Sequence, residues 1–126
     1  LGQTICLGPK PKIEVFSWIL RSHACVMAYK PLPILDTVSP NKLFDAFACG
    51  RPVLHSTQGW LKYHCAEHGW GLAVKPFDAE SFNFAMEQLS EPERYAAMVQ
   101  KSLEMGQTTF NRERLAKKYL DVIQSL

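Results

Sequence analysis

The sequence predicts an α/β protein with a Rossmann-like, mainly parallel sheet flanked by helices. Short apolar runs of strand length alternate along the chain with segments whose apolar residues recur at helical spacing. Such alternation is typical of βαβ units, whose crossovers are right-handed. Glycine or proline lies at most of the expected element ends. The length predicts a single domain over residues 1–126.

The first half of the chain is predicted to hold three strands and two helices. The three strands are apolar runs, whereas the segment between the first two has apolar residues at Ile13, Phe16 and Ile19, which is helical spacing. Two prolines make the stretch before the second helix a loop. The expected elements are a strand at Thr4–Leu7, a helix at Lys12–His23, a strand at Ala24–Tyr29, a loop at Lys30–Val38, a helix at Pro40–Cys49 and a strand at Pro52–Ser56.

The second half is predicted to be mainly helical. Gly69 ends one helix before a short strand, and Pro92 begins another helix at a position that proline tolerates. An aspartate, Asp78, precedes the helix between them. The expected elements are a helix at Trp60–His68, a strand at Gly71–Val74, a helix at Ala79–Ser90, a helix from Pro92 and a last helix over about 111–126.

Composition and charge restrict the class of protein. The 126 residues are 47% hydrophobic and 21% charged, which is ordinary for a globular chain. The formal net charge of +2 is too small to indicate a nucleic-acid partner. Four cysteines without a Cys-x-x-Cys pair favour a reducing compartment. No segment reaches the length of a membrane span or has the form of a signal peptide, so we expect a cytoplasmic protein.

The segment from Thr37 to Val53 reads as loop, helix, glycine stop and strand. Ser39 is a good N-cap residue, and Pro40 at the first helical position loses no needed hydrogen bond. The N–H groups of the first turn stay unpaired and, together with the helix dipole, favour an anion. Gly50 is suited to the left-handed conformation that ends a helix. The pattern fits a phosphate site, and an ordinary capped helix without a ligand is the alternative.

Five segments of the chain carry a family resemblance. The most specific runs Ser-Pro-Asn-Lys-Leu-Phe-Asp from Ser39 to Asp45 and leads to Pro52-Val53. The other four are Thr4–Pro9, Gly69–Pro76, Phe77–Phe82 and Phe110–Ala116. In this order they resemble the C-terminal nucleotide-sugar-binding domain of GT-B glycosyltransferases, in the large retaining family often called family four. The resemblance covers nearly the whole chain and implies a truncated GT-B C-terminal domain.

The resemblance implies a diphosphate site at the start of the second helix. In the family, backbone amides of this loop hold the distal phosphate, which places Ser39, Asn41 and Lys42 at the diphosphate. The Lys42 ammonium group adds a charge-assisted hydrogen bond in this interpretation. The alternative is a solvated lysine that contacts no ligand.

The resemblance also implies contacts to the rest of the donor. Asp45 matches the acidic residue that accepts hydrogen bonds from the ribose hydroxyls, where the family usually has the longer glutamate. An ion pair of Asp45 with Lys42 is the alternative. Thr37 stands where many members carry a glutamate that faces the donor sugar. Gly8 and Lys10 are expected to border the nucleobase.

The function implied by the resemblance is sugar transfer by the intact protein. The donor is a UDP- or GDP-sugar, UDP being the expected nucleotide, and the acceptor is a glycan or lipid-linked molecule held by an N-terminal domain. No cofactor or metal is expected, because the enzyme positions its substrates and stabilises the leaving diphosphate. The chain has no initiating Met and no match to the family's phosphate-clamping Arg and Lys, so we expect a fragment that transfers no sugar alone. A non-catalytic Rossmann-like nucleotide-binding or interaction domain is the alternative.

A zinc motif competes with this interpretation. Residues 64–68 read His-x-x-Glu-His, the pattern of an inverted metalloprotease helix. The expected helix ends immediately after His68, and the sequence offers no clear third ligand. We therefore expect a polar helix end and no metal.

Two further surfaces are expected to meet partners. The last helix carries a basic face and, by resemblance, packs toward the missing N-terminal domain. The basic side chains are expected to be solvated, and their contact with anionic lipid on the cytoplasmic side of a membrane is the alternative. The strand at Thr4–Leu7 has lost its expected neighbours, and the exposed sheet edge favours a dimer.

Overall fold

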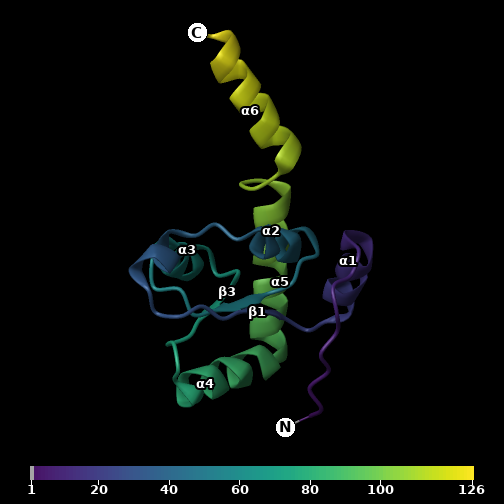
Figure 1. Ribbon diagram of the computed structural model, residues 1–126, viewed down its shortest axis with the longest axis vertical. Coiled ribbons are helices and arrows are strands. Elements are labelled where there is room, and N and C mark those ends of the chain that lie inside the picture. The colour runs from purple at the N-terminus through teal and green to yellow at the C-terminus, as the bar shows by residue number, and fades with distance from the viewer. Residues whose placement is uncertain (1) are drawn as a thin grey trace.

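The structure is a computed structural model that describes residues 2–126, and it confirms the predicted α/β class. A three-stranded parallel sheet is flanked by helices (Figure 1). The elements of this range are α1 (Lys12–Arg21), β1 (Cys25–Met27), the 3₁₀ helix η1 (Pro33–Thr37), α2 (Asn41–Ala48), β2 (Val53–His55), α3 (Trp60–His68), β3 (Gly71–Ala73), α4 (Ala79–Ser90), α5 (Pro92–Gln107) and α6 (Arg112–Gln124).

Strand β2 is the centre of the sheet, and its three residues are all buried. Leu54 of β2 pairs with Val26 of β1 on one side and with Leu72 of β3 on the other. All three strands run in the same direction, so their carboxyl ends lie at one edge. Ligands of open parallel sheets bind beyond that edge.

The two faces of the sheet bury separate apolar clusters. Successive side chains of a strand point to opposite faces. Val53 packs with Phe47 of α2 and Leu61 of α3, whereas Leu54 packs with Ala85 and Leu89 of α4. Residues of α5 contribute to both clusters, and in Figure 1 this helix passes behind α2 at the centre of the molecule. The sheet therefore has helices on both faces, as expected for βαβ units.

Helix α2 ends as the glycine predicts. Gly50 has a φ of 62°, in the left-handed region. Its N–H donates to the Phe47 carbonyl at 3.0 Å, and the Arg51 N–H donates to the Ala46 carbonyl at 2.9 Å. This pair of hydrogen bonds defines a Schellman motif, which satisfies two carbonyls that the helix end leaves free.

The predicted strand at Thr4–Leu7 is wrong. Residues 2–11 have no regular secondary structure and are exposed, and Ile5 and Leu7 lie largely in solvent. A short strand gains little unless a neighbour pairs with it and a helix covers it. Within residues 2–126, β1 pairs only with β2, so its outer edge is unpaired.

One local expectation needs correction, and the last helix has its expected place. The loop predicted at Lys30–Val38 contains the 3₁₀ helix η1, in which Leu35 donates its N–H to the Leu32 carbonyl at 2.8 Å. Helix α6 has the expected position, and Asn111 caps it by accepting from the Arg114 N–H at 3.0 Å. It projects away from the sheet (Figure 1), and none of its residues is buried.

Candidate functional site

Helix α2 begins one residue later than predicted, with consequences for the candidate phosphate site. Pro40 occupies the N-cap position in extended conformation, so Ser39 is not the N-cap residue. In the described part of the chain, no side chain caps this helix, and the N–H groups of Asn41 and Lys42 have no hydrogen-bond partner. The first paired N–H is that of Leu43, which donates to the Pro40 carbonyl at 3.0 Å. Two free donors at the positive end of the dipole favour an anion there.

A cavity of about 860 Å³ lies beside α2, which we call the donor cavity. Its polar lining comes from Asn41 and Asp45 of α2, Lys12 of α1, Arg112 of α6 and Asn111, the N-cap residue of α6. Phe44 and other apolar side chains supply the rest of the wall. The volume is in the range of small-molecule sites, which are mostly apolar with a few polar groups. The donor cavity thus contains two of the predicted donor-binding residues.

Asp45 makes an ion pair that the sequence did not predict. Its Oδ1 lies 3.3 Å from the Lys12 Nζ, and its side chain is 23% exposed. The alternative pairing with Lys42 is wrong, since the structure has no such ion pair among residues 2–126. The Lys12 and Asp45 side chains are both at least partly exposed to solvent, so the ion pair itself contributes little to the stability of the fold. Its effect is to hold one carboxylate and one ammonium group at the same cavity wall.

The other predicted donor-binding residues do not line the donor cavity. These are Gly8, Lys10, Thr37, Ser39 and Lys42. The Thr37 hydroxyl donates to the Ile34 carbonyl at 2.9 Å within η1, and Lys10 pairs with Glu14 at 3.3 Å. Gly8 lies in the exposed N-terminal segment. Ser39 and Lys42 lie within two residues of Asn41 in the chain, and neither is among the residues that line the cavity.

Sequence reasoning missed Lys12 and Arg112 as members of the site. They lie far from α2 in the chain, and neither belongs to a motif that indicates a ligand. Lys12 is the first residue of α1 and Arg112 is the first residue of α6, and only the tertiary fold brings them to the cavity. Their cationic side chains are of the type that binds phosphate.

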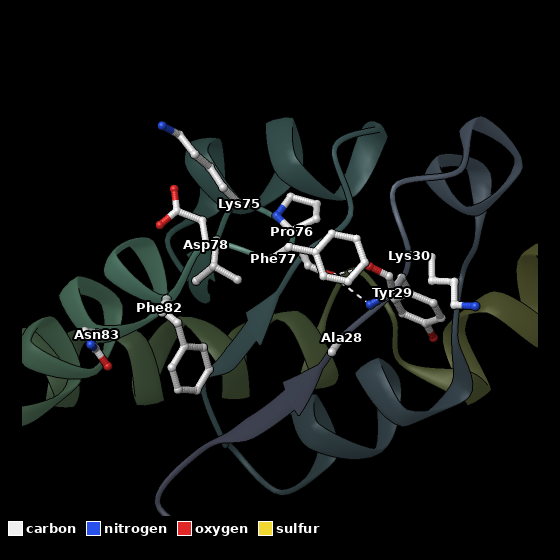
Figure 2. A pocket seen from close by; sticks show the side chains of 12 residues that line it. Ala28, Tyr29, Lys30, Lys75, Pro76, Phe77, Asp78, Phe82 and Asn83 are labelled. Atoms are coloured by element: carbon white, nitrogen blue, oxygen red, sulfur yellow. Dashed lines mark hydrogen bonds between the residues drawn. The ribbon is translucent and has the colours of Figure 1, made fainter.

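A second cavity, of about 510 Å³, lies at the carboxyl ends of the strands, and we call it the sheet-edge cavity (Figure 2). Tyr29 follows β1, Ser56 follows β2, and Phe77 follows β3. The Ser56 hydroxyl joins two of these segments: it accepts from the Tyr29 N–H at 2.7 Å and donates to the Tyr29 carbonyl at 3.0 Å. None of the predicted donor-binding residues lines this cavity.

The residues of the zinc motif are engaged in other contacts. The Trp70 Nε1–H donates to the His64 Nδ1 at 2.8 Å, and the His64 and His68 rings lie 4.2 Å apart. Burial, followed by the nearby His68, lowers the pKa of His64. Residues 2–126 contain no cluster of three or more His, Cys, Asp or Glu side chains placed to hold a metal ion.

Comparisons with known proteins identify no relative of this chain. The chain matches no protein-family model, no curated protein and no solved structure. The fold is that of an α/β protein with a Rossmann-like parallel sheet. None of the helices in residues 2–126 combines the length and apolarity needed to cross a bilayer.

Proposed function

We propose that this chain is the donor-binding part of a retaining glycosyltransferase that uses a nucleoside diphosphate sugar, with UDP as the expected nucleotide. The observation that carries the proposal is the placement of Asn41 and Asp45 on one wall of the donor cavity, next to the uncapped start of α2. The family resemblance of the Ser39–Asp45 segment supports the same assignment.

Each part of the donor has a matching group in this interpretation. The free N–H groups of Asn41 and Lys42 receive the distal phosphate, because unpaired donors and the helix dipole act together there. Lys12 and Arg112 add positive charge at the cavity. They take over part of the role that an Arg and a Lys, unmatched in this sequence, have in the family, where these residues clamp the phosphates. Asp45 accepts hydrogen bonds from the ribose hydroxyls.

The chemical step follows from charge. When the bond between the sugar and the diphosphate breaks, negative charge grows on the leaving diphosphate. Donors that are already oriented toward it stabilise that charge more than they stabilise the intact donor. The acceptor and an N-terminal domain complete the enzyme, so we expect the isolated chain to bind donor and to transfer no sugar.

The alternative function is a non-catalytic nucleotide-binding domain. The ion pair of Asp45 with Lys12 favours it, because a ribose must compete with the lysine for the carboxylate. Sugar transfer by the intact protein, lost on substitution of Asp45, separates the enzyme from a binding domain that shows no transfer.

Isothermal titration of the chain with millimolar UDP tests the proposal. We expect binding that Asp45→Asn weakens by roughly 10- to 150-fold, since a hydrogen bond to a charged group is worth about 1.5–3 kcal/mol. Asp121→Asn, at an exposed acid of α6 outside the cavity, is the matched control and leaves the affinity unchanged. No UDP binding, or equal binding by the two variants, contradicts the proposal.

A further inference from the structure

We propose that the sheet-edge cavity is a second ligand site, which binds a small planar aromatic anion. Phe77 and Tyr29 contact the ring of this ligand, and Lys30 and Lys75 receive its charge. The site is separate from the donor cavity and does not depend on the function proposed for it.

The first argument is the backbone of Phe77. Its φ of 57° makes it the one non-glycine residue with positive φ in the described range. The Asp78 N–H reaches the Lys75 carbonyl at 3.4 Å, and Pro76 precedes Phe77. Proline followed by a residue of positive φ is the pattern of a type II turn, in which glycine is the preferred second residue. A bulky residue at this position is an outlier, and such outliers cluster at ligand sites.

The second argument is the exposure of the Phe77 side chain. The residue is 87% exposed, so its ring gains almost nothing from burial in the core. Neither the turn nor the packing accounts for phenylalanine here. Figure 2 shows the ring extending from the β3–α4 turn toward Tyr29 and Lys30 at the end of β1. A ligand between these segments would cover the ring.

The third argument is the chemistry of the cavity wall. Phe77, Tyr29 and Phe82 line the cavity from three segments, and the wall is predominantly apolar. Tyr29 and Phe82 also pack against the two core clusters, whereas the Phe77 side chain is exposed. Aromatic rings favour other rings in stacked or edge-to-face arrangements. A planar aromatic molecule fits these walls better than a flexible polar one.

The fourth argument is charge. Lys30 and Lys75 line the rim, and neither ammonium group has an ion-pair partner in residues 2–126. The one acid of the rim, Asp78, has its Oδ1 engaged as a cap for the Ser81 N–H at 2.8 Å. In Figure 2 the Lys30 and Lys75 side chains extend away from the cavity, and their flexible stems let each ammonium group turn toward a ligand seated there. The rim therefore favours an anion.

The test uses 2-naphthyl phosphate as the probe, with 2-naphthol and inorganic phosphate as the neutral and non-aromatic comparators. Amide spectra of the ¹⁵N-labelled chain locate each compound. We expect 2-naphthyl phosphate to shift the amides of Tyr29, Phe77 and Asp78, and to bind more tightly than either comparator. Shifts confined to other surfaces, or equal affinity of all three compounds, overturn the proposal.

Phe77→Gly separates binding from folding. Glycine suits positive φ, so we expect the thermal midpoint to stay the same or rise while probe affinity falls roughly tenfold. Phe84→Ala removes an exposed ring of α4 outside the cavity and is the matched control. We expect Lys30→Ala and Lys75→Ala each to weaken 2-naphthyl phosphate a fewfold and to leave 2-naphthol unchanged. Unchanged probe affinity in Phe77→Gly overturns the proposal.

The same variants distinguish this site from the donor cavity. UDP is expected to respond to Asp45→Asn and not to Phe77→Gly, whereas the probe responds in the opposite way. If UDP responds only to Phe77→Gly, the sheet-edge site stands and the donor-site proposal fails. If the probe responds only to Asp45→Asn, the sheet-edge proposal fails.

Discussion

His55 is a fully buried imidazole at the end of the central strand, and one of its nitrogens is unsatisfied. Its Nδ1 lies 2.9 Å from the Thr57 Oγ1, while the Nε2 has no hydrogen-bond partner in the described residues. Its ring lies 5.4 Å from that of Trp70. Burial lowers the pKa of His55 from 6.5 to about 4, against a smaller opposite effect of a hydrogen bond with the Thr57 backbone.

This pKa predicts acid sensitivity. Between about pH 6.5 and 4 the unfolded chain takes up a proton at His55 and the folded chain does not, so stability is lost as the pH falls through this window. The full loss is about 3 kcal/mol. Urea unfolding across this pH range measures it.

His55→Gln is the variant for this measurement, and His68→Gln, at a half-buried helix end, is the control. Relative to wild type, we expect His55→Gln to reduce the slope of the unfolding free energy against pH. We expect His68→Gln to retain most of that slope. His64, whose pKa is also lowered by burial, contributes to the slope that remains. Identical slopes in wild type and His55→Gln would contradict this assignment.

Residue-level predictions with a local cause had mixed outcomes. Gly50 takes its predicted left-handed conformation, whereas Ser39 is not the N-cap residue of α2. Asp78, which the sequence places directly before α4, caps that helix. The partner of Asp45 could not be predicted, since Lys12 meets it only after α1 and α2 have docked. For the same reason, the role of Phe77 is invisible in the sequence until its φ is known.

At the level of elements, the contact between α2 and α5 depends on a glycine. A Cβ on Gly106 would lie 2.8 Å from the Phe47 carbonyl oxygen and 2.9 Å from its carbon. These are backbone atoms inside a packed helix, which cannot move aside cheaply. Gly106 thus allows the close approach of two helices.

Gly106→Ala is therefore expected to destabilise the fold. Overpacking costs about 1–3 kcal/mol, and alanine regains about 1 kcal/mol of helix propensity, so the clash wins. Chemical denaturation should show a lower free energy of unfolding. Gly8→Ala, at a position with open space around it, should be neutral. A more stable Gly106→Ala protein would show that the two helices are less closely packed.

The elements differ in how far the sequence could predict them. Helix α4 has the predicted bounds, because its cap and its apolar spacing are local. The strand expected at Thr4–Leu7 has equally good local features, yet it does not form. A strand needs a partner along its edge, and no local pattern supplies one.

At the scale of the whole molecule, α6 carries an apolar face with no partner among the described residues. Tyr119 is 70% exposed and Ile123 is 48% exposed, and the helix projects beyond the body of the fold (Figure 1). The expected packing of this helix on another domain remains a prediction.

Substitutions on α6 test whether this face contributes to the fold of the chain itself. We expect Tyr119→Ala and Ile123→Ala to change the free energy of unfolding by less than about 0.5 kcal/mol. Leu89→Ala, in the core beneath the sheet, should cost about 2–5 kcal/mol. A large loss in either α6 variant would mean that the helix packs against the chain in solution.

The whole-molecule prediction succeeded for the fold class, whereas the donor site stays a prediction. The alternating strand and helix patterns predicted the parallel sheet, because the spacing of apolar residues in each segment reflects which face of that strand or helix is buried. Of the predicted donor-binding residues, Asn41 and Asp45 meet at one cavity, and the others lie elsewhere. The members added by the structure, Lys12 and Arg112, come from distant helices that only the tertiary fold brings together.

The most direct test of the donor site is a titration of the ¹⁵N-labelled chain with UDP, followed by amide spectra. The two free N–H groups at the start of α2 should receive the phosphate, so the amide signals of Asn41 and Lys42 should shift in wild type and much less in Asp45→Asn. Signals of Asn41 and Lys42 that stay in place at saturating UDP would contradict a donor site at this helix.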